Sequence, residues 1–220
     1  MKKILALILC GLMIWTVFTG CSADEAGLEK KTYTAAGEIT ELQIDVKDRK
    51  ISLEPSPDGL VHLTYWESEK EFYEPTESEQ TLRLTSEENK RWTDYIGGSA
   101  SLEARTIRVQ IPESGLAILS LSTTNEDLAV PHLHLADTLT VLVNHGNIRL
   151  EGPEVGGAIR LETKNGDISG AIVGSYDDFS ITSQVKKGES NLPEKKEGGE
   201  KSLTAAVNNG DLEIEFEPAG

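Results

Sequence analysis

The 220-residue sequence is poor in the residue types that most often build catalytic and metal sites. It has two cysteines and four histidines, and 5% of its residues are aromatic. Because Cys10 lies inside an apolar segment near the amino terminus, Cys21 is the only thiol in the rest of the chain. One cysteine cannot form an internal disulfide, so the fold must be stabilised by packing alone. No Gly-x-Ser-x-Gly sequence is present, so the nucleophile pattern of an α/β-hydrolase is missing too.

Basic residues are scarce relative to acidic ones. The chain has 21 Lys and Arg against 37 Asp and Glu, a formal net charge of −16 at pH 7. Such a surface repels polyanions, so nucleic acid and anionic lipid head groups are poor partners on total charge. It attracts cations and basic surfaces, but a strong negative charge is also a common means of staying soluble.

The amino-terminal apolar run is too short for a membrane-spanning helix. Residues 4–18 form an uncharged apolar stretch of 15 residues behind Lys2 and Lys3, which is typical of a secretory signal. Thr19-Gly20-Cys21 follows, and a cysteine directly after small residues is similar to a bacterial lipoprotein signal. In that class of signals the peptidase cuts before the cysteine, which then carries the lipid. Phe18 departs from the pattern, because Leu is usual at its place.

We therefore expect residues 1–20 to be a lipoprotein signal peptide and residues 21–36 to be the lipidated Cys21 and a polar tether. The protein would then sit on the extracytoplasmic face of a bacterial membrane, held there by the lipid. An ordinary secretory signal with a coincidental cysteine is the alternative.

What the sequence does contain is a repeat. One pattern returns five times at intervals of 20 to 22 residues, around the anchor positions Asn125, His145, Asn165, Lys187 and Asn209. The template has aliphatic residues at offsets −6, −4 and −2, a Gly/Asp-type turn, and aliphatic residues at +3 and +5. Because side chains alternate across a strand, it describes two short strands with one apolar face. Stacking such units makes the apolar columns continuous, so the repeat predicts a β-solenoid.

The folded part is predicted to be all-β and to span residues 37–217, with an amino-terminal β region at 37–112 and solenoid repeats at 113–217. Residues 42–53 fit the template around Asp48, as a sixth copy with Arg49 in the glycine position. Three alternating apolar runs then precede the repeats, and their hairpin-like spacing predicts antiparallel strands in a hairpin-rich, sandwich-like arrangement.

Three charged segments and one copy of the repeat depart from this pattern. Residues 67–80 and 86–101 are expected to project as loops, and residues 186–201 to form a flexible stretch. Ser183 and Ser190 replace aliphatic residues around Lys187, so that copy is expected to be distorted.

The turns resemble those of a known family. Asn165-Gly166-Asp167-Ile168 and Asn209-Gly210-Asp211-Leu212, with weaker copies at 125–128 and 145–148, are similar to the β-strand repeats of the bacterial putative-adhesin family, a domain of unknown function in envelope proteins. The run at residues 107–112, which leads into the repeats, adds to the resemblance, and it covers about residues 38–217. The resemblance implies the architecture. It carries over no catalytic residues, because the family has no agreed activity.

Two groups of side chains suggest a metal site. Stacked Asp oxygens at the turns could coordinate Ca²⁺, but calcium-binding β-rolls repeat every nine residues, and Asn147 and Glu189 interrupt the Asp column. His132 and His134 share one strand face and could bind zinc or copper, but two ligands make an incomplete site. Turn formation and a solvated outer face explain these residues, so we expect no metal and no other cofactor.

Aromatic residues concentrate in the amino-terminal region. Trp66, Phe72, Tyr73, Trp92 and Tyr95 form a candidate binding surface, because loop aromatics beside acidic residues can hold a sugar or a peptide. The alternative is that they cover the open end of the solenoid.

No nucleophile, base and acid can be assigned together, and the outward column at offset +4 shows no cluster of carboxylates. We therefore expect a non-enzymatic, lipid-anchored envelope protein that presents a β-solenoid surface to a protein or glycan partner, with no nucleic-acid role. The alternatives are a polysaccharide-acting solenoid enzyme and an accessory protein of an envelope stress or sensing system.

Overall fold

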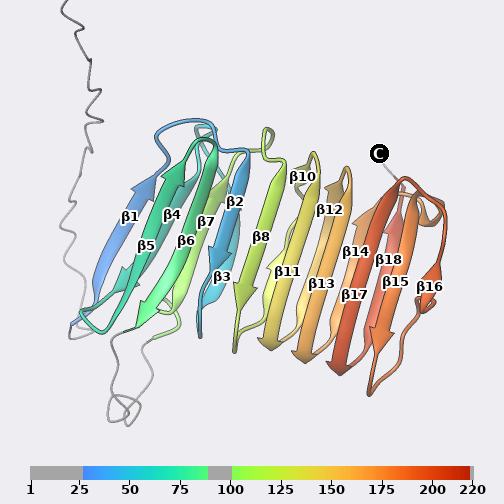
Figure 1. The fold of residues 1–220 in the computed structure, drawn as a ribbon. Coiled ribbons are helices and arrows are strands. Elements are labelled where there is room, and N and C mark those ends of the chain that lie inside the picture. Colours follow the sequence, from blue (N-terminus) through green and yellow to red (C-terminus); the bar gives the residue numbers. More distant parts are fainter. Residues whose placement is uncertain (1–26, 89–100, 219–220) are drawn as a thin grey trace, which may run out of the picture.

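The computed structural model describes residues 27–88 and 101–218 (Figure 1). Within these ranges the chain is built almost wholly of strands, and the only helix is one 3₁₀ turn, η2 (Tyr176–Asp178). The strands are β1 (Glu29–Thr34), β2 (Glu41–Asp45), β3 (Lys50–Pro55), β4 (His62–Glu67), β5 (Glu71–Ser78), β6 (Thr81–Glu88), β7 (Thr106–Ile111), β8 (Ile118–Thr123), β9 (Leu128–Val130), β10 (His134–Leu135), β11 (Thr138–His145), β12 (Ile148–Val155), β13 (Ala158–Asn165), β14 (Ile168–Val173), β15 (Phe179–Val185), β16 (Lys195–Lys196), β17 (Lys201–Asn209) and β18 (Leu212–Glu217).

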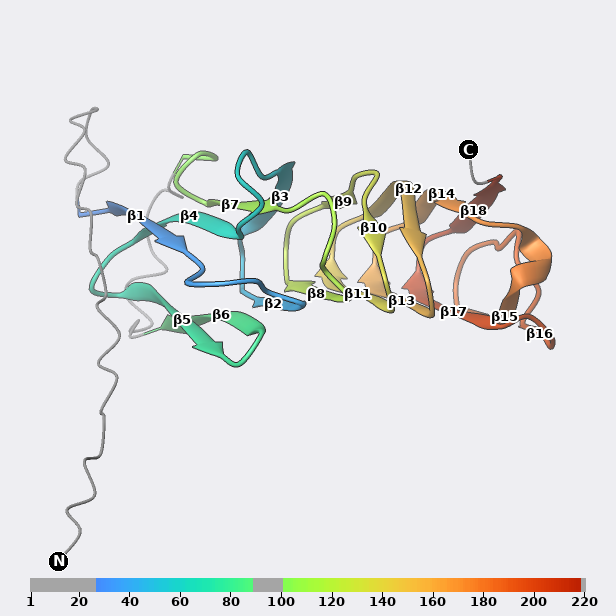
Figure 2. The same ribbon diagram turned by 90° about the horizontal axis from the view of Figure 1, so that it is seen from above.

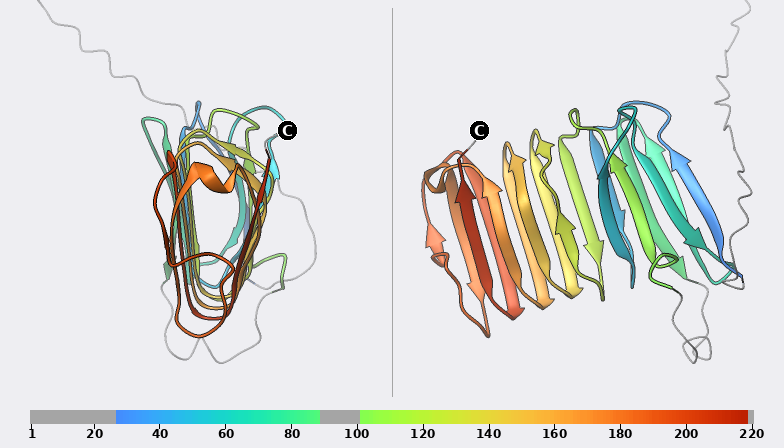
Figure 3. Two further views of the ribbon diagram at one scale, coloured as in Figure 1. Left: turned by 90° about the vertical axis from the view of Figure 1, so that its right-hand side faces the viewer. Right: turned by 180° about the vertical axis from the view of Figure 1, so that it is seen from behind.

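Two walls of strands face each other across one core (Figure 2). The nine-stranded wall has the order β16-β15-β17-β13-β11-β8-β2-β6-β5. The opposite wall consists of two sheets set end to end (Figure 2). We call them the amino-terminal sheet, with the order β1-β4-β7-β3, and the carboxy-terminal sheet, with the order β10-β12-β14-β18 and β9 paired to β12. Seen along its axis, the molecule is a flattened tube whose rungs overlie one another (Figure 3).

The apolar columns read from the sequence form the core. At offset −6, Leu139 pairs with Leu119 on one side and with Ile159 on the other, in parallel register. Ile159 in turn pairs with Leu203. Side chains in this column are at most 1% exposed, as parallel strands stacked in one wall require. The predicted β-solenoid is therefore confirmed, and the sixth copy joins it because Leu42 pairs with Leu119.

Each turn is shaped by the rung beside it. The three glycines Gly146, Gly166 and Gly210 follow their anchors with φ between +139° and +148°. A Cβ on Gly166 would lie 2.1 Å from the carbonyl oxygen of Gly146, and one on Gly210 would lie 2.1 Å from that of Gly166. The backbones of successive rungs thus approach too closely at this corner for any side chain, which explains the glycine column.

Two positions after each anchor, a side-chain oxygen links each rung to the next. Asp127 Oδ1 accepts a hydrogen bond from the Asn147 N–H at 2.7 Å, and Asn147 Oδ1 accepts one from the Asp167 N–H at 2.8 Å. Asp167 Oδ1 then accepts from the Asp211 N–H at 2.9 Å, and Asp211 Oδ1 from the Glu189 N–H at 2.8 Å. We call this chain of bonds the corner ladder. The corner ladder gives a hydrogen-bond acceptor to one backbone N–H per rung, at a corner where no strand pairing would supply one.

The rungs do not stack in chain order. β17 lies between β13 and β15, so the last copy of the repeat fills the penultimate place and the copy around Lys187 forms the end. As expected, that copy is distorted, because its second strand is reduced to a single bridge between Ser190 and Leu212. A rung at the end needs an apolar neighbour on only one side, so its serines cost least there. Similarly, β2 lies between β6 and β8.

The predicted tether and the predicted loop at residues 67–80 are wrong in part. Residues 29–34 form β1, which pairs antiparallel with β4, because Tyr33 alternates with threonines and packs against the core. Residues 71–78 form β5, which pairs antiparallel with β6. β5 tolerates Pro75 because it is the last strand of the nine-stranded wall and needs partners on one side only.

The two regions that we expected to meet at residue 112 share the nine-stranded wall, because β2 of the first region pairs in parallel with β8 of the second. In the opposite wall, β3 and β7 also pair in parallel. The amino-terminal region therefore continues the solenoid, and the antiparallel strands β1, β4 and β5 lie at its end. Residues 186–201, which we expected to be a flexible stretch, include β16 and the buried Leu192, and they cover the edge of β15.

Candidate interaction surface

The candidate binding residues fall into two groups. Cys21, Trp92 and Tyr95 lie outside the described residues. Trp66 is on β4 and Phe72 and Tyr73 are on β5, at the end of the molecule where β1 begins (Figure 1).

Tyr73 belongs to the core and is not a surface residue. It is 6% exposed, and its ring packs against Tyr65 with the two centroids 4.9 Å apart. The Nε of Arg49 donates a 2.6 Å hydrogen bond to the Tyr73 hydroxyl, and Arg49 forms a 2.7 Å ion pair with Glu71. Arg49 thus brings a buried charge into contact with a hydroxyl and a carboxylate of β5, and it ties the β5–β6 hairpin to the end of the solenoid. These tyrosines act as the end cap that the sequence offered as an alternative.

The cap keeps its hydroxyls neutral. Burial raises the pKa of Tyr65 to about 12, with a smaller contribution from the Glu67 carboxylate. Burial also raises the pKa of Tyr33 to about 12, helped by the 2.9 Å hydrogen bond that Tyr33 donates to Glu77. The pKa of Tyr73 is raised by burial too, although Arg49 opposes this shift.

Trp66 and Phe72 do not form one surface. Tyr65 and Tyr73 point inward from opposite walls, so their chain neighbours Trp66 and Phe72 point outward on opposite sides of the molecule. The sequence could have shown this separation, because adjacent residues of a strand, such as Tyr65 and Trp66 or Phe72 and Tyr73, point to opposite faces. Of the predicted set, Trp66 therefore remains as the aromatic residue of one outer face, where Lys30 lies 6.0 Å from its ring centroid.

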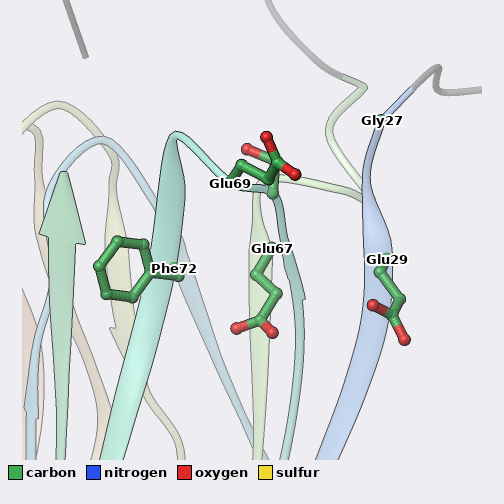
Figure 4. A pocket seen from close by; sticks show the side chains of 6 residues that line it. Gly27, Glu29, Glu67, Glu69 and Phe72 are labelled. Atoms are coloured by element: carbon green, nitrogen blue, oxygen red, sulfur yellow. The ribbon is translucent and has the colours of Figure 1, made fainter. Parts of the chain in front are cut away.

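A hollow of about 350 Å³ lies beside Phe72 (Figure 4). Its lining includes Glu29, Glu67 and Glu69, whose carboxylates Figure 4 shows at its margin. Lys31 lies 2.9 Å from Glu29 and 3.7 Å from Glu67, so two of these carboxylates are already ion-paired. The lining holds no histidine or cysteine, and its one hydroxyl oxygen, Ser68 Oγ, accepts hydrogen bonds from the backbone N–H groups of Lys70 and Glu71.

A second hollow, of about 300 Å³, lies on the carboxy-terminal sheet. Gly170 and Ala171 form its floor, because they carry little or no side chain, and Glu213 and Glu215 stand beside them on β18. Both carboxylates are exposed. No group in this lining can serve as a nucleophile other than the carboxylates themselves.

The residues weighed for metals have structural partners. The Asp column supplies the corner ladder, which explains why Asn147 can replace Asp: an amide oxygen accepts the same backbone hydrogen bond. His132 Nδ1 lies 2.7 Å from the Gly152 carbonyl oxygen, and His134 Nδ1 lies 3.4 Å from Glu154 on the neighbouring rung. Within the described parts of the chain, no three His, Cys, Asp or Glu side chains converge as a metal site would require.

The outer face of the nine-stranded wall carries rows of small polar side chains. In register across five strands, one row reads Ser120, Thr140, Arg160, Thr204 and Thr182. Arg160 pairs with Glu162 on its own strand at 2.5 Å. Over residues 27–88 and 101–218, no helix has the length and apolar character needed to cross a membrane.

Residues 39–141 match the family model described as Toastrack DUF4097. This part of the chain is similar to Toastrack DUF4097 domains. The match begins before β2 and ends within β11, so it contains the sixth copy, Tyr65 and Tyr73 of the end cap, and the first repeats. The rungs that follow the matched residues extend the same two walls. The resemblance to adhesin-like repeat proteins is confirmed at the level of family and fold.

Two solved structures match the chain, and the first of them is similar in fold. A putative cell adhesion protein from Clostridium sporogenes has a TM-score of 0.57 at 13% identity, over 86% of this chain and 100% of that one. A putative adhesin from Bacteroides fragilis has a TM-score of 0.36 at 12% identity, over 88% of this chain and 98% of that one. No curated protein sequence is significantly similar to this chain.

Proposed function

We propose that this protein is a non-enzymatic, adhesin-like component of a bacterial cell envelope, held on the extracytoplasmic face of a membrane by a lipid on Cys21. Its task is to present the outer faces of the solenoid to an envelope protein or a glycan. The observation that carries the proposal is the pair of walls, which display flat, regular rows of polar side chains on a rigid core.

Three further observations support it. The apolar run before Cys21 has the length of a secretory signal, and the small residues before the cysteine fit lipid attachment. Neither of the two hollows is lined by a histidine or a cysteine. The Clostridium sporogenes protein of similar fold bears the name of a putative cell adhesion protein, and an adhesive role agrees with an exposed, stable β surface.

The anchor is tested by two cysteine substitutions. Cys21→Ala removes the acceptor of the lipid, whereas Cys10→Ala removes the other cysteine and leaves the signal apolar. We expect wild type and Cys10→Ala to partition into detergent with the membrane fraction, and Cys21→Ala to be unprocessed or released. Unchanged processing and partition of Cys21→Ala would contradict the lipid anchor.

A polysaccharide-acting enzyme is the second candidate, because Glu213 and Glu215 adjoin an open hollow on neighbouring positions of one strand. Glu213→Gln and Glu215→Gln would abolish turnover of cell-wall glycans if these carboxylates were catalytic. We expect wild type itself to show no turnover. An accessory role in envelope stress sensing is compatible with the same anchored protein, and it would appear as a signalling partner bound to an outer face.

A further inference from the structure

The outer face of the amino-terminal sheet differs in charge from the rest of the molecule. Twelve side chains point outward from its four strands: Lys30, Thr32 and Thr34 on β1, His62, Thr64 and Trp66 on β4, Thr106, Arg108 and Gln110 on β7, and Lys50, Ser52 and Glu54 on β3. Among them are three cations and one carboxylate, in a protein of net charge −16. The carboxy-terminal sheet, on the same side of the molecule, carries the carboxylates Glu151, Glu213 and Glu215 and the cation Arg149, which forms an ion pair with Glu151.

The cations gather around the tryptophan. Lys30 on β1 is directly opposite Trp66 on β4. Arg108 on β7 is opposite Thr64, two residues from Trp66 on the same face of β4. Lys50 lies one strand further, next to β7. Adjacent strands are about 4.8 Å apart, so this patch spans about 14 Å across four strands.

These three cations are available for a ligand. Lys30, Lys50 and Arg108 are exposed, and none of them forms an ion pair within the described residues. The single carboxylate of the face, Glu54, lies opposite Gln110 at the far end of β3 and so is four residues away from Lys50. Trp66 is half-buried on the same face.

We propose that this face, which we call the Trp66 patch, binds an acidic polysaccharide. The ring of Trp66 offers an apolar plane against which the C–H side of a sugar can pack. Lys30, Arg108 and Lys50 meet the carboxylate or phosphate groups of successive residues along the polysaccharide chain. The hydroxyls of Thr32, Thr64 and Ser52, which lie in the same row as Arg108, hydrogen-bond sugar hydroxyls.

The composition of the face favours a glycan over a lipid bilayer. Surfaces that lie in a membrane interface combine basic residues with a broad apolar face, and none of the twelve outward side chains is aliphatic. Polar side chains around one aromatic ring match a polyhydroxylated ligand instead.

This inference deepens the proposed function and rests on it for its setting, but its test needs no anchor. A chain that begins at Ser22 retains every described strand and buried residue, and circular dichroism checks its fold. The probe is sodium polygalacturonate, an acidic pyranose polymer, with neutral dextran as its uncharged counterpart. Vesicles of phosphatidylglycerol test the lipid alternative.

Two double variants with the same change in net charge distinguish loss of contacts at the Trp66 patch from general repulsion between the polysaccharide and a more negative protein. Lys30→Glu/Arg108→Glu reverses two cations of the patch. Arg83→Glu/Lys164→Glu reverses two exposed cations on the outer face of the nine-stranded wall. We expect the first to weaken polygalacturonate binding by roughly tenfold or more and the second to leave it within about twofold. Trp66→Ala should weaken it by roughly fivefold.

Salt dependence adds a second readout. Binding to the patch should weaken as NaCl rises from 0.1 M to 0.5 M, because exposed charges are then screened over a shorter distance. Equal losses in the two double variants, no binding of polygalacturonate by wild type, or binding to the vesicles alone would each overturn the proposal. The Cys21→Ala result would be unaffected by any of these outcomes, because the chain from Ser22 has no anchor.

Discussion

The glycine column allows a quantitative test of the stacking. Gly166→Ala adds one methyl group at a corner where its Cβ would lie 2.1 Å from the Gly146 carbonyl oxygen and 2.5 Å from the carbonyl carbon. Both atoms are backbone, so no side chain can rotate away. The φ of +141° is unfavourable for alanine as well. Gly59→Ala is the matched control, because its φ is +80° and its Cβ would meet nothing within 4 Å.

Gly166→Ala lowers the free energy of unfolding in two ways, through an unfavourable φ and through overpacking, and Gly59→Ala has only the first cost. A left-handed φ at a non-glycine residue costs about 1–2 kcal/mol, which is the whole expected effect of Gly59→Ala. Gly166→Ala adds an overpacking cost of roughly 1–3 kcal/mol, because two rungs joined by the 2.9 Å bond from the Gly146 N–H to the Asn165 carbonyl must separate. We therefore expect a total loss of about 2–5 kcal/mol in the free energy of unfolding.

The assay is urea unfolding followed by circular dichroism. With a urea dependence near 2.5 kcal/mol per molar, the midpoint should fall by about 0.5 M for Gly59→Ala and by about 1.5 M for Gly166→Ala. Equal shifts in the two variants would refute the close approach of the rungs, since conformation alone would then explain both glycines.

Other substitutions test the ladder, the cap and the order of the rungs. Asp167→Ala should lower the free energy of unfolding by about 1 kcal/mol and Asp167→Asn by much less, because an amide oxygen still accepts the backbone hydrogen bond; equal losses would argue against the ladder. Since burial raises the pKa of Tyr65 above its ordinary value of 10, the neutral form is favoured in the folded state. Stability from this group should be complete below pH 10 and fall as pH rises towards 12, and Tyr65→Phe should flatten that part of the urea-unfolding profile. In a chain from Ser22, which has no cysteine, a short thiol cross-linker should join Arg160→Cys to Thr204→Cys but not to Thr182→Cys, and the reverse result would restore chain-order stacking.

Much of the fold could be predicted because each copy of the repeat contains the signals for its own two strands and its turn. Alternation with period two sets the inward face, and the Asn-Gly-Asp turns set the corner, so Leu139 and Ile159 were identified as core residues from spacing alone. Arg49 in a glycine position signalled an exception, and the structure shows its side chain turned into the cap.

The order of the rungs could not be predicted, because the apolar columns of all copies are nearly interchangeable. A stack with β15 next to β13 would bury similar side chains, and only the polar Ser183 and Ser190 distinguish the Lys187 copy as an end rung. β1 and β5 were missed for another reason. Both are end strands whose sequences are charged on one side, so their hydrophobic pattern is weak.

The candidate site was harder than the fold. Trp66 and Tyr73 were grouped by composition, but function depends on which face a side chain occupies, and that is settled by strand pairing across walls. The cations of the Trp66 patch are more than 75 residues apart in the sequence at their extremes, Lys30 and Arg108, and only the register of β1, β4 and β7 brings them together. Trp92 and Tyr95 remain predictions.

The most direct test of the proposed function is site-specific photo-cross-linking in intact cells. A photoreactive residue would replace Thr32 on the amino-terminal sheet, Thr204 on the nine-stranded wall or Glu213 on the carboxy-terminal sheet, all of which are exposed. We expect at least one of these positions to give a discrete adduct with an envelope protein or glycan, and the adduct to disappear when Cys21→Ala is added. If the wild-type protein were in the membrane fraction and none of the three outer faces gave an adduct, the claim that these faces bind a partner would be contradicted.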